Sequence, residues 1–135
     1  MTDASAPRPV PDADSRPFWE ALQQRRVTFQ RCRSCGEAQL YFRALCKHCQ
    51  SPEIDIEESS GLGTVYSFTI VHRVGNPILN DQTPYVLAIV EMAEGPRVVT
   101  RIETDPGDVA VGDEVTATFR QLDDQTTLLY YAPVE

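Results

Sequence analysis

The sequence contains few of the residues and motifs from which catalytic sites are commonly built. Only two of its 135 residues are histidines, and neither forms a recognisable catalytic pair with a nucleophile. The phosphate-binding patterns G-x-x-x-x-G-K-[ST] and G-x-G-x-x-G do not occur, and neither do the G-x-S-x-G and H-E-x-x-H motifs of hydrolases. The sequence therefore favours a binding or accessory protein over a free-standing enzyme.

Long apolar runs and an export signal are also missing. No segment approaches the ~18 apolar residues of a membrane span, and the N-terminus has no basic region followed by an apolar stretch. We therefore expect a cytoplasmic protein. Basic residues are scarce in the second part of the chain: residues 1–50 carry a net charge of +3, whereas residues 51–135 carry −11. Such an acidic half would repel the phosphate backbone of a nucleic acid.

What the sequence does contain is a matched pair of cysteine motifs, Cys32-x-x-Cys35 and Cys46-x-x-Cys49, with no cysteine left over. Each motif can present two thiolates from one tight turn, and two such turns together make a tetrahedral sulfur site for zinc. We predict that these four cysteines bind one structural Zn²⁺, because a catalytic zinc normally keeps an open position and has histidine or carboxylate ligands.

Other roles for these cysteines stay open at this point. Two disulfides would suit an exported chain, and a redox-active pair would need a thioredoxin-like βαβ pattern nearby; the sequence shows neither signal. His48 could replace a thiolate, but we expect an exposed turn residue because four cysteines already complete the ligand set. Gly36 follows the first motif and tolerates positive φ. Gln50 holds the matching position after the second motif, so we expect the second turn to lack the help that a glycine gives at this position.

The N-terminal segment predicts a tail followed by a short helix. Residues 1–15 are rich in Pro, Ala, Asp and Ser, which is typical of a disordered tail. A helix is expected over residues 17–24, where Phe18, Trp19 and Leu22 share one face. This apolar stripe either packs on the protein's own core or docks into a partner.

The remainder predicts a mainly β protein. Alternation indicates a strand at residues 27–31, and the apolar residues 40–42 are expected to form another that covers the sulfurs. Further on, turn signals separate five expected strands, at residues 64–73, 85–94, 97–103, 114–122 and 126–132. The predicted fold is a short N-terminal helix and rubredoxin-like zinc ribbon within residues 16–52, followed by a five-stranded OB-fold barrel within residues 53–135.

Two details of the barrel bear on function. Strict alternation in its first strand would place Val65 on one face and Tyr66, Phe68 and Ile70 on the other. The long connection over residues 74–84 includes the apolar Ile78 and Leu79, which either fold over a barrel end or contact a ligand or partner. His72 is the best single candidate for chemistry, followed by Arg73, because both stand where that first strand meets the long connection.

These segments together resemble the acyl-CoA-associated zinc-ribbon/OB-fold family, formerly catalogued as a domain of unknown function. The likeness covers roughly residues 17–133. It is carried by the cysteine motifs and by five further segments, namely Pro17–Leu22, Gly61–Arg73, Pro84–Glu91, Glu94–Arg97 and Val111–Val115. The resemblance implies a non-catalytic accessory subunit of a thiolase-fold enzyme, such as a thiolase or an aldolase that cleaves steroid side chains. The partner would carry the catalytic residues, and this chain would stabilise it and could help to form the acyl-CoA site.

Contacts with coenzyme A or the partner are expected in the basic first half and at His72 and Arg73. The arginines of the first half could attract phosphates, pair with an acidic partner surface, or simply be solvated. The candidate partner- or CoA-binding residues are Phe18, Trp19, Leu22, Arg25, Arg26, Arg31, Arg33, Arg43, His72 and Arg73. The alternative is a single-stranded nucleic-acid-binding protein, because zinc ribbons and OB-folds both occur in that class.

Overall fold

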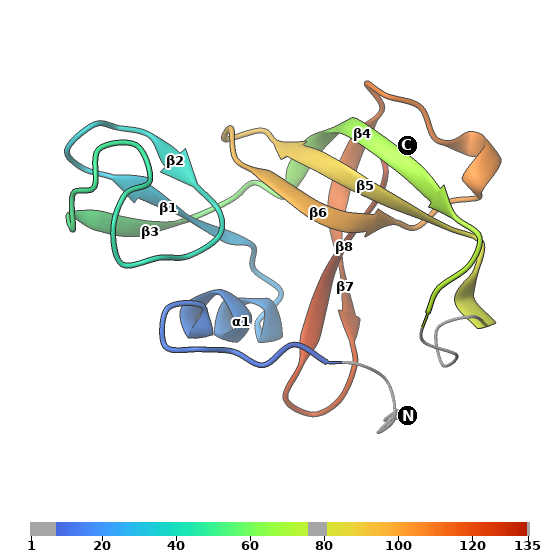
Figure 1. The fold of residues 1–135 in the computed structure, drawn as a ribbon, viewed down its shortest axis with the longest axis horizontal. Coiled ribbons are helices and arrows are strands. Elements are labelled where there is room, and N and C mark those ends of the chain that lie inside the picture. The colour runs from blue at the N-terminus through green and yellow to red at the C-terminus, as the bar shows by residue number, and fades with distance from the viewer. Residues whose placement is uncertain (1–7, 76–80, 135) are drawn as a thin grey trace.

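The chain begins with a short helix, continues into a small sheet and ends in a closed barrel (Figure 1). The structure is a computed structural model that describes residues 8–75 and 81–134. The predicted mainly β fold is confirmed. Within the described residues, no helix is long and apolar enough to cross a membrane. Ile78 and Leu79, which we considered as contact residues, lie outside the described residues.

The helix α1 (Arg16–Gln23) lies within one residue of its expected position. A turn precedes it, in which the Ser15 backbone N–H donates to Asp12 Oδ1 at 2.8 Å. Leu22 is fully buried, and Phe18 and Trp19 pack against the core from its edge. The apolar stripe therefore anchors the helix to the protein's own core, since burying one leucine contributes about 1.5–3 kcal/mol.

The ribbon is a three-stranded antiparallel sheet in the order β2-β1-β3. Its central strand β1 (Thr28–Cys32) was expected, but β3 (Ile54–Glu58) was not, and β2 (Ala38–Gln39) replaces the strand predicted at residues 40–42. That segment leaves the sheet because its side chains face the helix and barrel. Leu40 is buried in the core, and the backbone N–H of Val99 donates to the Tyr41 hydroxyl at 3.3 Å.

The barrel contains the five predicted strands, displaced at their ends by only a few residues. Its strand order is β4-β5-β6-β8-β7, with a single parallel contact that closes the barrel between β6 and β8. The strands are β4 (Leu62–Val71), β5 (Tyr85–Met92), β6 (Arg97–Ile102), β7 (Glu114–Gln121) and β8 (Thr127–Pro133), with a 3-10 turn at Pro106–Asp108 between β6 and β7.

A β-bulge in β4 corrects the expected alternation of its side chains. Val65 pairs with Val90 and Ser67 with Ile89, so Tyr66 is the extra residue. Beyond the bulge, Phe68 pairs with the buried Ala88, so Phe68 shares the core-facing side with Val65 instead of opposing it. Strict period-2 reasoning was wrong here because one inserted residue reverses every later position.

Ribbon and barrel share one apolar core. Leu22, Phe29 and Leu40 from the first half belong to the same buried cluster as Val65 and Tyr131 of the barrel. A ribbon of this size cannot bury enough apolar surface to fold by itself. Packing against the barrel therefore supplies stability to the ribbon and fixes its position.

A carboxylate fastens the segment that joins the two modules. Glu94, in the turn between β5 and β6, accepts the Ser59 hydroxyl and the Ser60 backbone N–H, each at 2.8 Å. Burial alone would raise the pKa of Glu94, but these two donors outweigh it and lower the pKa below its ordinary value of 4.5. The ionised carboxylate thus holds the linker against the barrel.

Replacing Glu94 with Gln should lower the free energy of unfolding by about 1 kcal/mol at neutral pH, because the charge-assisted bonds are lost. A carboxyl whose folded pKa is depressed stabilises the fold above its unfolded pKa and loses that effect as pH falls through the folded value. The difference between wild type and variant should therefore be full above about pH 5 and shrink at lower pH. Denaturant unfolding across pH measures it.

The matched control is Glu91→Gln on the neighbouring strand. Glu91 forms an exposed ion pair with Arg97 at 3.1 Å, and such pairs contribute little to stability. A Glu94→Gln variant that unfolds like Glu91→Gln at every pH would contradict the proposed role of the linker contact.

Candidate functional site

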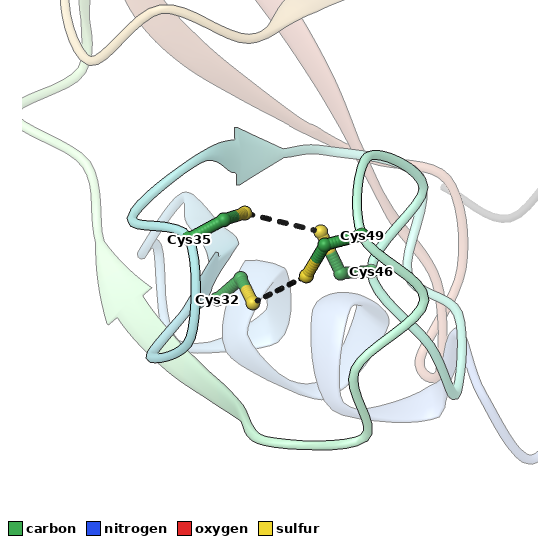
Figure 2. A group of neighbouring side chains, drawn as sticks. All are labelled: Cys32, Cys35, Cys46 and Cys49. Carbon is green, nitrogen blue, oxygen red and sulfur yellow. Dashed lines mark hydrogen bonds between the residues drawn. The ribbon is translucent and has the colours of Figure 1, made fainter.

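The four cysteines meet at one point between the two turns of the ribbon (Figure 2). Their sulfur atoms all lie within 4.8 Å of one another, and the Cys32–Cys49 and Cys35–Cys46 sulfur pairs are each 3.6 Å apart. Zn–S bonds of about 2.3 Å in a tetrahedron place sulfurs about 3.8 Å apart, so the spacing fits zinc. All four cysteines are free, so the alternative of two disulfides is not what the structure shows.

Both cysteine turns have the same backbone geometry. The N–H of Gly36 donates to the carbonyl of Cys32 at 2.9 Å, and the N–H of Gln50 donates to the carbonyl of Cys46 at 2.8 Å. Gly36 has φ of 81° and Gln50 has φ of 64°. The second turn therefore reaches the same geometry without the glycine that helps the first, and Gln50 adopts a conformation that is unfavourable for a residue with a side chain.

The first cysteine of each motif has a lowered thiol pKa even without a metal. The backbone N–H of Cys35 is the main cause that lowers the pKa of Cys32 to about 6, and the N–H of Cys49 likewise lowers the pKa of Cys46. For Cys35, the N–H of Glu37 acts in the same direction, but burial and the neighbouring sulfurs outweigh it and raise the pKa to about 12. A bound dication would displace the protons that remain.

Two buried glutamines hold the second cysteine turn in place, and the sequence analysis did not identify them. Gln30 and Gln39 face each other across β1 and β2, with Gln39 Nε2 donating to Gln30 Oε1 at 2.7 Å. Gln39 Oε1 accepts the backbone N–H of Lys47 at 2.9 Å, next to Cys46. Their positions in an alternating strand looked like ordinary polar ones, so only the loop that folds over them reveals the role.

Most of the candidate arginines in the ribbon have internal acidic partners. The antiparallel pairing of β1 and β3 places acidic side chains opposite basic ones. The ion pairs are Arg26–Glu58 at 3.4 Å, Arg31–Glu57 at 3.1 Å, Arg33–Glu53 at 2.8 Å and Arg33–Asp55 at 3.3 Å. Each side chain in these pairs remains partly exposed, so the pairs lie on the surface of the ribbon.

The other candidates lie apart from one another. Arg25 donates to the carbonyl of Phe119 on the barrel at 3.1 Å, whereas Arg43 is exposed and its backbone N–H and carbonyl bond the Gln30 side chain. His72 and Arg73 are exposed beyond β4, which ends on the side of the barrel away from the ribbon (Figure 1). The structure therefore does not bring His72 and Arg73 together with the ribbon arginines.

Phe18, Trp19 and Leu22 do come together, along one wall of a groove of about 430 Å³. The opposite walls come from residues 40–42 of the ribbon and from strands β5, β6 and β8 of the barrel. Arg101 and Tyr130 also line the groove, and the sequence analysis identified neither. Outward-facing strand residues give no sequence signal that they will be enclosed by a distant helix.

Two family models match the chain over the modules just described. The rubredoxin-like zinc ribbon domain of ChsH2 matches residues 19–55, and the C-terminal OB-fold domain of ChsH2 matches residues 57–120. The break between the two matches falls within β3. The family match and the cysteine geometry agree that the first module is a zinc ribbon with a structural zinc site.

Several relatives have informative names. The chain is 34% identical over 131 residues to a probable enoyl-CoA hydratase alpha subunit of Thermomonospora curvata, covering 96% of this chain but only 40% of that relative. It is 35% identical over 107 residues to a DUF35 domain-containing scaffold protein of Methanocaldococcus jannaschii, covering 77% and 75%. It is also 35% identical over 89 residues to the benzoylsuccinyl-CoA thiolase subunit BbsA of Geobacter metallireducens, covering 65% and 58%.

A solved structure matches along nearly the whole chain. A chain of the Ltp2-ChsH2(DUF35) aldolase superposes with a TM-score of 0.83 at 34% identity, and the match covers 93% of this chain and 98% of that one. The arrangement of helix, ribbon and barrel is thus common to both proteins.

Replacing the buried Cys46 with Ser should abolish stoichiometric zinc binding and destabilise the ribbon by about 3 kcal/mol or more, because metal ligation supplies much of the folding free energy of such a module. Metal analysis of protein purified under reducing conditions should find one zinc per chain in the wild type. Ser34→Ala is the control, since it removes only the exposed contact between the hydroxyls of Ser34 and Ser51. Full zinc content in Cys46→Ser would contradict the ligand assignment.

Proposed function

The chain belongs to the ChsH2 family, formerly DUF35, of proteins that join a zinc ribbon to an OB-fold, and we propose that it is a non-catalytic accessory subunit of a thiolase-fold enzyme. In this role it binds and stabilises a thiolase or an acyl-CoA aldolase and helps to form the acyl-CoA site. The observation that carries the proposal is the match to almost the entire length of a chain from an aldolase complex. The relative named as a thiolase subunit supports the same class of partner.

The chemistry of the described residues supports a role without catalysis. Four thiolates fill the coordination sphere of a zinc ion and leave no position for a substrate or water, which is the arrangement of structural sites. His48 lies on the ribbon and His72 beyond β4, and both are exposed. A relative named as a scaffold protein fits this interpretation. The relative named as a hydratase subunit is much longer than this chain, so its name carries less weight.

The free cysteines support the proposed cytoplasmic location, because thiols remain reduced and available for zinc in a reducing compartment. Nucleic acid is disfavoured as a ligand, since the second half is strongly acidic and Arg26, Arg31 and Arg33 of the ribbon pair with acidic residues in or next to β3. The substrates of the complex would be acyl-CoA thioesters, as the names of the thiolase and hydratase subunits indicate for those relatives.

Co-purification from the source organism, followed by reconstitution, tests the proposal. Tagged wild-type protein should retain a thiolase-fold enzyme in a fixed ratio. The two purified components together should cleave or form a carbon–carbon bond in the acyl group of an acyl-CoA faster than the partner alone does. The reason is that the accessory chain stabilises the active assembly. The isolated chain should show no turnover.

The Cys46→Ser variant serves as the negative control for the pull-down, since it should lose the ribbon and with it the partner. Recovery of no thiolase-fold enzyme by the wild type would overturn the proposal, and so would turnover of acyl-CoA by the chain alone.

A further inference from the structure

The groove beside α1 has the properties of a binding site for a small apolar molecule. Its volume of about 430 Å³ lies within the usual range of ligand pockets, which are mostly apolar with a few well-placed polar groups. It lies over the outward face of the sheet, where Leu87 of β5 and Val99 of β6 alternate with residues that point into the barrel. Aromatic side chains from three separate segments enclose it, namely Phe18, Trp19, Tyr41, Phe42 and Tyr130.

The mostly apolar lining of the groove includes one basic residue, Arg101, and one acidic residue, Asp12, and the guanidinium of Arg101 has a fixed orientation. The guanidinium of Arg101 lies 3.7 Å from the centre of the Tyr85 ring and 5.6 Å from that of Tyr130. Its Nη1 donates to Gln82 Oε1 at 2.6 Å. Two rings and an amide therefore hold the guanidinium in place before any ligand arrives.

The charge of Arg101 is uncompensated, in contrast to that of its neighbour on the same strand. Among the described residues, no carboxylate lies within 4 Å of the Arg101 guanidinium. Arg97 stacks on Tyr66 at the same distance of 3.7 Å but also pairs with Glu91. A partly buried guanidinium without a counter-ion favours an oxygen acceptor from outside the chain.

We propose that this groove binds an apolar acyl group, with its carboxylate or thioester oxygen held by Arg101. The apolar body of the ligand would replace water against Trp19, Phe42 and Val99, while the oxygen accepts from the free N–H groups of the guanidinium. The origin of the acyl group, as the substrate of a partner enzyme, rests on the proposed function. The binding itself is a property of this chain and is tested without the partner.

Trp19 reports on the groove directly, because it is the only tryptophan of the chain and lines the site. The experiment titrates zinc-loaded full-length protein with decanoate and, separately, with decanol, while Trp19 fluorescence is recorded. Decanoate should produce a saturable change at a lower concentration than decanol, since only decanoate offers a charged oxygen to Arg101. Absence of a saturable change with decanoate, or equal affinity for the two compounds, would overturn the proposal.

Arg101→Gln and Arg97→Gln form a matched pair of variants, because both remove an arginine stacked on a tyrosine of β4 or β5 at the same distance. Arg101→Gln should weaken decanoate binding about tenfold, as expected for loss of one charged hydrogen bond, and leave decanol unchanged. Arg97→Gln should bind both like the wild type. Circular dichroism and thermal unfolding verify that both variants fold. Equal loss of decanoate binding in the two variants would contradict the assignment.

A second arm separates this inference from the proposed function. In one outcome, a thiolase-fold partner co-purifies with the wild type, Val99→Glu abolishes that association, and wild-type protein does not bind decanoate. The groove is then a docking surface for the partner, and the acyl proposal fails. If decanoate binds as expected and no thiolase-fold partner is found, the groove assignment stands and the proposed function fails.

Discussion

The convergence of four sulfur atoms is the constraint on which the N-terminal part of the structure depends. The sheet of the ribbon has a two-residue edge strand, β2, and the loop that returns from it to β3 contains no further strand. Metal ligation closes that loop, and the buried pair Gln30 and Gln39 fixes its path. With the loop fixed, Leu40 and Tyr41 reach the barrel, and the helix has a second wall to pack against. The groove therefore depends on the sulfur cluster, which lies outside it.

Local sequence patterns were enough to predict the helix, the central strand of the ribbon and the five strands of the barrel. The spacing of the cysteines specified the sulfur cluster because each C-x-x-C turn is self-contained, and turn residues marked the ends of the barrel strands. The sequence could not show what depends on contacts between distant segments. Strand β3 is specified by its pairing with β1, and the bulge at Tyr66 by the register against β5. Residues 40–42 have strand-like composition, but the barrel provides a better apolar surface for them than the ribbon sheet does.

The same limit applies to the site. The metal ligands could be predicted because one short motif carries two of them. Arg101 could not, because its importance comes from what surrounds it: Tyr85, Tyr130, Gln82 and a helix some eighty residues earlier in the chain. Three of the arginines that the sequence made conspicuous, Arg26, Arg31 and Arg33, have acidic partners in or next to β3. Arg101, which has no such partner among the described residues, stands in an inconspicuous strand. Composition identifies where charges are plentiful, and only the fold shows which of them are still available.

The acidic side chains of β3 also shape how the protein meets other molecules in solution. Each ribbon cation that they neutralise contributes little potential beyond the Debye length of about 8 Å at physiological ionic strength. At long range, the electrostatic potential of the molecule is therefore that of its acidic barrel, which attracts basic surfaces. The ribbon contributes little to this long-range attraction. Added salt should then slow the encounter with a basic surface more than it weakens the complex once formed, because contacts made by the ribbon depend on shape and apolar area rather than on long-range attraction.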